Sequence, residues 1–227
     1  MEITLVDEEI SFREFTVAEQ EQVTLCLAAF SSFPDCEIYV KVHKNAKIDV
    51  NFADFSAGSG TLKLYVFLLE EGAEATFRGA SLCKGDSRKK IDACLFHESP
   101  HTTGLVSNYG IAMEQGRLSF SGTSHLKQGT VGSSTRQEAK IIVFDPESDG
   151  KCEPILIIDE SDITASHAAT VGKLNEDHLF YLLSRGIEEK KAKRLMTMGY
   201  LKPIISHFPE ALKKRLDEAI EGGVNND

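Results

Sequence analysis

One histidine, His167, lies in the run Ser-His-Ala-Ala-Thr-Val-Gly and is the leading candidate for metal chemistry in this chain. A neutral imidazole nitrogen binds iron or zinc. A lone histidine beside small residues is more often a structural one, held by hydrogen bonds within the fold. The residues alone therefore leave a metal ligand and a structural histidine both open.

A second group, His97, Glu98 and His101, has the spacing of the zinc-protease motif H-E-x-x-H. That motif works on a helix, where both rings share one face. The intervening Ser99-Pro100 prevents a regular helix. The group therefore does not predict a zinc protease.

The cysteines are odd in number and include no Cys-x-x-Cys pair; they are Cys26, Cys36, Cys83, Cys94 and Cys152. This pattern favours reduced cytosolic thiols over a disulfide framework. A protein that holds its own iron–sulfur cluster needs closely spaced thiolates. We therefore expect no stably bound cofactor.

Other catalytic patterns are weak. The glycine-rich stretch 110–132 contains neither a phosphate-binding loop nor a dinucleotide fingerprint. The acids Asp159, Glu160 and Asp162 fit a solvated turn as well as a glycosidase pair. We expect a protein that is not an enzyme.

The elements that carry these residues are mostly short strands. Apolar residues alternate in several segments separated by polar turns: 22–28, 38–42, 48–52, 62–66 and 73–77. The units HKNAKIDVNF and EEGAEATFRG resemble each other, which indicates a repeated coil. The absence of a helical pattern before Asn175 argues against alternating strands and helices. A sandwich, a barrel and a β-solenoid all remain open on periodicity alone.

After Asn175 the pattern changes to short helices. Helices are predicted over 176–185, over 188–198 with Gly199 as a cap, and from Pro209 to Gly222-Gly223. The last residues, 224–227, are expected to form a frayed tail. The sequence thus divides into a β core over 1–174 and a helical subdomain over 175–227.

Composition narrows the function classes. The chain has 227 residues, 41% hydrophobic and 26% charged, and a net charge of −10. The negative charge argues against nucleic-acid binding. No apolar run is long enough to cross a bilayer, and the acidic start is not a secretory signal. We expect a cytoplasmic protein without a membrane contact, and we interpret the basic cluster Arg88-Lys89-Lys90 as solvated surface.

Several motifs occur together in order: HTTG, SNYGIAMEQGRLSFSG, KQGTVGSSTRQEAKII, SHAATVG, LFYLLSRGI and EEKKAKRLMTMGY. Between about Ile91 and Tyr200 the chain resembles the SufB/SufD family of iron–sulfur cluster assembly proteins, and SufD more than SufB. The resemblance implies a right-handed parallel β-helix with a C-terminal helical subdomain, acting as a scaffold.

The resemblance also implies partners. The chain would pair with a SufB-like subunit, or with itself, through an edge strand containing Leu156, Ile157 and Ile158. The helical segment with Leu179, Phe180, Tyr181 and Arg185 would dock a SufC-type ABC ATPase; these four residues form a single predicted docking element. By the same resemblance His167 matches a position proposed to contribute to a transient cluster at the subunit interface.

Three positions depart from the family pattern. Ala168 stands where SufB has a glutamate, Glu138 where SufB has its scaffold cysteine, and Ala165 where many SufD proteins have a cysteine. These differences indicate that the chain is not a SufB, and they reduce the ligand set at the interface to His167.

Two other functions are alternatives. A β-helix carbohydrate-active enzyme would need a cleft of acids and arginines, and Arg78, Arg117 and Arg136 do not obviously converge. A structural homodimer without a cluster role is the other. Co-purification with an ATPase would distinguish these functions.

Overall fold

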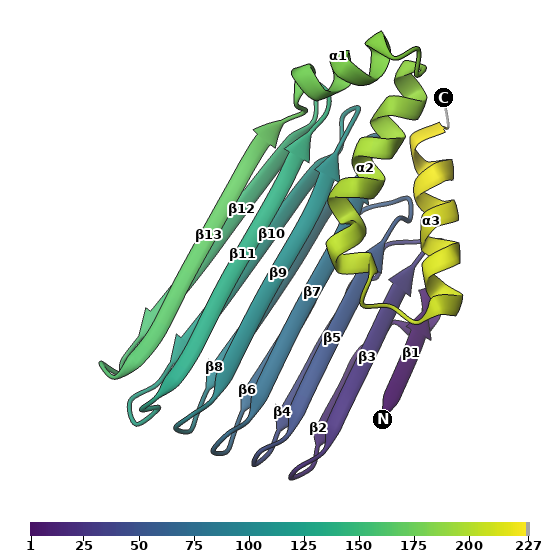
Figure 1. Ribbon diagram of the computed structural model, residues 1–227. Coiled ribbons are helices and arrows are strands. Elements are labelled where there is room, and N and C mark those ends of the chain that lie inside the picture. Colours follow the sequence, from purple (N-terminus) through teal and green to yellow (C-terminus); the bar gives the residue numbers. More distant parts are fainter. Residues whose placement is uncertain (226–227) are drawn as a thin grey trace.

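The structure is a computed structural model that describes residues 1–225. Within that range the chain winds into a solenoid of two facing parallel sheets, and helices follow the last strand (Figure 1). The seven-stranded sheet of the described residues contains β1 (Glu2–Val6), β3 (Gln22–Ala29), β5 (Lys47–Asp54), β7 (Glu74–Cys83), β9 (Thr103–Ala112), β11 (Ser133–Val143) and β13 (Ile163–Lys173). The six-stranded sheet of the same residues contains β2 (Arg13–Val17), β4 (Cys36–Val42), β6 (Gly60–Leu68), β8 (Arg88–His97), β10 (Arg117–Leu126) and β12 (Asp149–Ile158).

Consecutive strands alternate between the sheets, so each coil stacks on the preceding one in parallel register. Leu25, Val50, Phe77 and Val106 occupy matching positions on four successive coils, and all four are buried in the interior. Period-two alternation sends such residues inward on every coil. The expected parallel β-helix is confirmed.

The interior changes character along the solenoid. The first coils are filled with aliphatic and aromatic side chains, whereas the later coils bury His97, Asn108, Ser124, Thr135 and Gln137. Ser124 Oγ accepts hydrogen bonds from Thr135 Oγ1 at 2.9 Å and from Gln137 Nε2 at 2.7 Å. The late interior is therefore held partly by hydrogen bonds.

The described residues also form a 3₁₀ turn, η1 (Asp7–Glu9), and three helices, α1 (Glu176–Ser184), α2 (Glu189–Ile205) and α3 (Glu210–Asn225). In Figure 1, α2 and α3 lie across the outer face of the seven-stranded sheet. That face presents a row of small residues in register, Ala28, Ala53 and Ala80. A second core forms there with Leu201, Ile204, Ile205, Phe208, Leu212, Leu216 and Ile220. Small side chains let the helices approach the sheet closely.

Two predicted helix ends are wrong. Helix α2 continues through Gly199 to Ile205 and includes Pro203, although that proline removes the hydrogen bond to the Gly199 carbonyl. Burial of Leu201 and Ile204 against the sheet outweighs this local cost. Helix α3 likewise continues through Gly222 to Asn225. Of the predicted tail, residues 226–227 lie outside the described residues.

The boundary predicted at 174/175 stays a prediction. The helices begin there, but α2 and α3 share a core with the sheet. Removing them would uncover apolar side chains such as Leu82 and Ile111.

Candidate interface at the open coil and the first helix

The last coil of the solenoid, formed by β12 and β13, is uncovered. Both strands are terminal in their sheets within the described residues. Four large apolar side chains are exposed there: Ile155 at 46%, Ile157 at 42%, Ile158 at 46% and Val171 at 44%. An uncovered apolar edge of this kind is what a soluble protein usually protects or pairs.

Register defines which of these side chains continue the interior. Leu156 and Ile158 match the inward residues Ser124 and Leu126 of β10, whereas Ile155 and Ile157 match the outward ones. The next coil that stacked here would thus cover Leu156 and Ile158 as core residues.

The backbone at this edge has a defined polarity. The amides of Asp149, the first residue of β12, and of Asp159, just after its end, donate to the carbonyls of Gly116 and Leu126 on the β10 side at 3.0 and 2.9 Å. Alternation then points the amides of odd-numbered residues toward β10 and the amide of Leu156 toward the open edge. Pro154 also faces the open edge, where its missing N–H removes no bond within the chain.

His167 lies on β13, in register with the inward Gln137 of β11. Gln137 is buried and donates from Nε2 to Ser124 Oγ at 2.7 Å and to the Ile155 carbonyl at 3.1 Å. His167 itself is exposed, and its ring makes no hydrogen bond or ion pair among the described residues. The histidine therefore occupies the interior side of a coil on which no further described strand stacks.

The same coil carries Cys152, also on the inward side and half-buried. Burial raises the pKa of this thiol to about 11, so it stays protonated at neutral pH. Across the described residues, no three histidine, cysteine or acidic side chains gather as a metal site. His167 would need donors from outside the described residues to complete a metal site.

The H-E-x-x-H group is not helical, as the sequence predicts. His97 ends β8, and His101 has a φ of 56° in the following turn. His97 is buried, its Nδ1 lies 2.8 Å from Thr102 Oγ1, and burial lowers its pKa to about 4. This histidine belongs to the polar interior.

Helix α1 lies at the carboxyl ends of the last strands and leads from β13 toward α2 (Figure 1). Asn175 caps it by accepting the His178 amide at 2.9 Å, and the helix buries none of its described residues. Phe180 is 72% exposed and Tyr181 is 56% exposed. The Arg185 guanidinium stacks over the Tyr181 ring at 5.2 Å.

A hollow of about 310 Å³ separates α1 from α2 and is lined by Tyr181, Leu182, Leu195 and Met196 with His178. Leu179 is half-buried and lines a different hollow, toward Val143 and Phe144. Phe180, Tyr181 and Arg185 are therefore available to a partner, and Leu179 only in part.

The interpretation of Lys89 as solvated surface is wrong. Alternation along β8 turns Lys89 inward between Arg88 and Lys90, and its side chain is 0% exposed. Its Nζ donates to Asp54 Oδ2 at 2.7 Å and to the carbonyls of Ser56 and Leu82 at 2.7 and 2.9 Å. Consecutive residues of a strand point to opposite faces, so Arg88, Lys89 and Lys90 cannot all lie on one solvated face.

The three arginines considered for a carbohydrate cleft are dispersed. Arg117 belongs to the six-stranded sheet, while Arg78 and Arg136 belong to the seven-stranded one. Arg78 is paired with Asp49 at 3.0 Å.

None of the helices among the described residues has the length and apolar character to cross a membrane.

The fold and this surface define a parallel β-helix protein with an open last coil and an exposed helix, α1, after its last strand. Residues 18–200 match the core domain of SufBD proteins, which belongs to the SUF system of iron–sulfur cluster assembly. The chain belongs to this SufBD family.

Individual relatives agree. The iron–sulfur cluster assembly protein SufD of Bacillus subtilis is 32% identical over 139 residues, covering 61% of this chain and 32% of that protein. A SufBD family protein of Mycobacterium bovis is 28% identical over 190 residues, covering 81% of this chain and 22% of that protein. A third, from Staphylococcus epidermidis, is 27% identical over 170 residues, 74% of this chain and 36% of that protein. The chain thus spans between about a fifth and about a third of the length of these relatives.

Proposed function

We propose that this chain acts as a SufD-like subunit of an iron–sulfur cluster assembly scaffold. It pairs with a SufB-like subunit, or with a second copy, through β12 and β13, and it docks a SufC-type ATPase through α1. The observation that carries the proposal is the open last coil. It combines exposed apolar residues with backbone amides that point toward the open edge of the sheet.

Pairing at this coil would complete both the edge of the sheet and the end of the solenoid interior. The carbonyls of a partner strand along β12 would accept hydrogen bonds from the free amides, and a partner coil would cover Leu156 and Ile158. The covered area would also include His167, which faces the same interior side. A cluster held there transiently would take His167 from this chain and its remaining ligands from the partner.

The direct test is affinity capture of the tagged chain from native cytosol, with mass identification of what binds. We expect a SufB-like protein and an ABC-type ATPase in the captured complex. Capture of copies of this chain alone would contradict the scaffold role and favour the structural homodimer.

We expect His167→Ala to lower cluster assembly in the reconstituted complex while leaving the fold and partner binding unchanged. The ring is exposed and makes no internal hydrogen bond among the described residues, so its removal creates no cavity within the chain. Cluster yield would be followed by visible absorbance and iron content. His167→Gln keeps much of the volume but is a poor iron ligand, so normal yield with glutamine would show that His167 is not a ligand.

We expect Phe180→Glu combined with Tyr181→Glu to weaken ATPase binding about tenfold or more, because exposed aromatic anchors carry a large share of interface energy. Both side chains are solvent-exposed, so the melting temperature should stay near that of the unmodified chain. Binding would be measured by calorimetry with the purified ATPase. The matched control is Phe12→Glu, an exposed aromatic at the other end of the chain. Equal weakening by the control, or no weakening by the pair, would exclude α1 as the docking element.

A further inference from the structure

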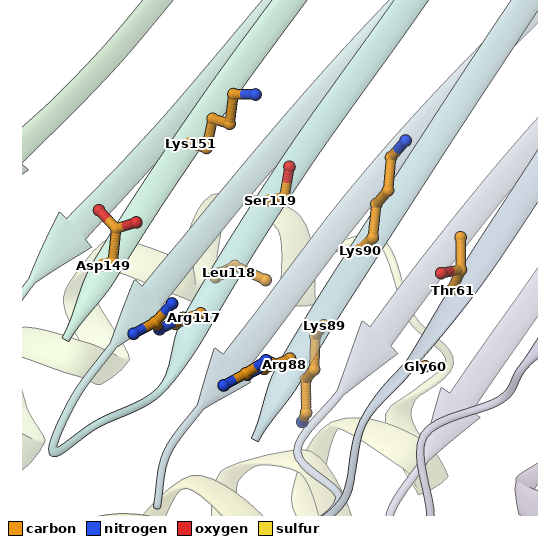
Figure 2. A pocket seen from close by; sticks show the side chains of 10 residues that line it. All are labelled: Gly60, Thr61, Arg88, Lys89, Lys90, Arg117, Leu118, Ser119, Asp149 and Lys151. Carbon is orange, nitrogen blue, oxygen red and sulfur yellow. The ribbon is translucent and has the colours of Figure 1, made fainter. Parts of the chain in front are cut away.

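The outer face of the six-stranded sheet is not covered by the helices, and its side chains form rows across the strands. Where the strands begin, one row contains Arg88, Arg117 and Asp149 on β8, β10 and β12. The next row contains Thr61, Lys90, Ser119 and Lys151. Figure 2 shows these outward side chains around one hollow, with Lys89 turned the other way.

The charges in these rows are unusual for a chain with a net charge of −10. Arg88 and Arg117 are directly opposite one another in the ladder, an arrangement that destabilises a sheet through like-charge repulsion. Neither guanidinium has an ion-pair partner among the described residues. An anion between the two guanidinium groups would remove the repulsion.

The other charged groups at the hollow are partly compensated. Lys90 Nζ lies 3.6 Å from Asp92, and Lys151 Nζ lies 2.8 Å from Glu153, both in the next row. Asp149, the one carboxylate among the residues that line the hollow, is opposite Arg117 in the ladder and offsets part of its charge, although no ion pair within 4.0 Å joins them among the described residues. The net positive charge of the row therefore comes from Arg88 and Arg117 together against one carboxylate.

The shape suits a small ligand. The hollow has a volume of about 390 Å³, within the range of small-molecule sites. Ser119 contributes a hydroxyl between the two lysines of its row. Arginine presents a planar fork of donors that matches phosphate and carboxylate oxygens.

We propose that this hollow binds a small polyanion with two phosphoryl or carboxylate groups, one against Arg88 and one against Arg117. Adjacent strands lie about 4.8 Å apart, so one small molecule can reach both guanidinium groups. Lys90 and Lys151 contribute long-range attraction, and the Ser119 hydroxyl donates a hydrogen bond. This site lies on a different face from α2 and α3, and it does not depend on the scaffold role.

The test is calorimetric titration of the full chain with pyrophosphate and, separately, with citrate. We expect binding that weakens with added salt, and a loss of about tenfold or more in the double variant Arg88→Gln/Arg117→Gln. The matched control, Lys41→Gln/Lys214→Gln, removes the same charge from exposed positions elsewhere and should bind normally. Tighter binding of pyrophosphate would identify a phosphorylated ligand, and tighter binding of citrate a carboxylated one.

Amide chemical shifts locate the site independently of any variant. We expect the titrated anion to perturb Thr61 and Ser119 in the unmodified chain. Absence of binding by both anions at millimolar concentration would overturn the proposal. An equal loss of affinity in the control variant would also overturn it. Binding of a polyglutamate peptide without binding of either small anion would overturn it as well.

Discussion

Replacing Lys89 by methionine is expected to destabilise the chain by about 3 to 5 kcal/mol, because the change leaves the Asp54 carboxylate buried without its cation. Both side chains of this pair are 0% exposed. Asp54 would keep the donors Ser56 Oγ and Ser81 Oγ, which only partly replace the ammonium group. For a domain of this size the loss corresponds to roughly 10 °C in melting temperature. Calorimetry and urea titration would measure it.

The matched control for this substitution is Lys47→Met. Lys47 forms an exposed pair with Glu74 at 3.6 Å, and such pairs contribute less than about 1 kcal/mol. The double variant Asp54→Asn/Lys89→Met should lose less than the sum of its single changes, because each single change strands the other partner. Equal losses in the free energy of unfolding for Lys89→Met and Lys47→Met would show that water reaches the buried pair of Lys89 and Asp54.

Leu156→Pro is expected to dissociate the complex formed at the open coil while leaving the single chain folded. The Leu156 amide faces the open edge, so proline removes a donor that only a partner strand would use. Pro154, two residues earlier and on the same side, shows that the strand accepts proline there. Light scattering at micromolar concentration should show a dimer, or a complex with the SufB-like subunit, for the unmodified chain and a monomer for the variant.

Two controls separate the backbone effect from the side-chain effect. Leu156→Ala shortens the side chain but keeps the amide, and should weaken pairing less. Ile157→Pro removes an amide that faces β10, so it should lower the melting temperature of the chain itself. A monomeric unmodified chain that also fails to bind a SufB-like subunit would contradict the role given to this edge.

The fold was largely predictable because its cause is local. Alternation over each strand and the recurrence of polar turns indicate a β fold, and the family resemblance selected the solenoid from the possible β architectures. The ends of α2 and α3 were not predictable. Gly199, Pro203 and Gly222 are helix breakers by local preference. Around Gly199 and Pro203, α2 is held by the apolar face of the sheet, which distant strands supply.

The candidate surfaces were predictable to different degrees. The family resemblance, and not residue type, pointed to Phe180 and to the β12 edge as partner surfaces, since a phenylalanine is by itself expected to be buried. The row of Arg88 and Arg117 was missed, since its members lie one coil apart and converge only through register. Recognising the coil period and comparing matching positions on successive coils would have revealed it.

The change from an apolar to a polar interior also affects how the solenoid unfolds. In a stack where each coil contacts only its neighbours, stability adds up coil by coil, and opening starts where the neighbouring contributions are smallest. The first coils have aliphatic filling and the cover of α2 and α3, whereas the last coils have hydrogen-bonded filling and an uncovered end. Amide hydrogens should therefore exchange fastest at β12 and β13, so the end proposed to bind a partner is also the most adaptable part of the stack.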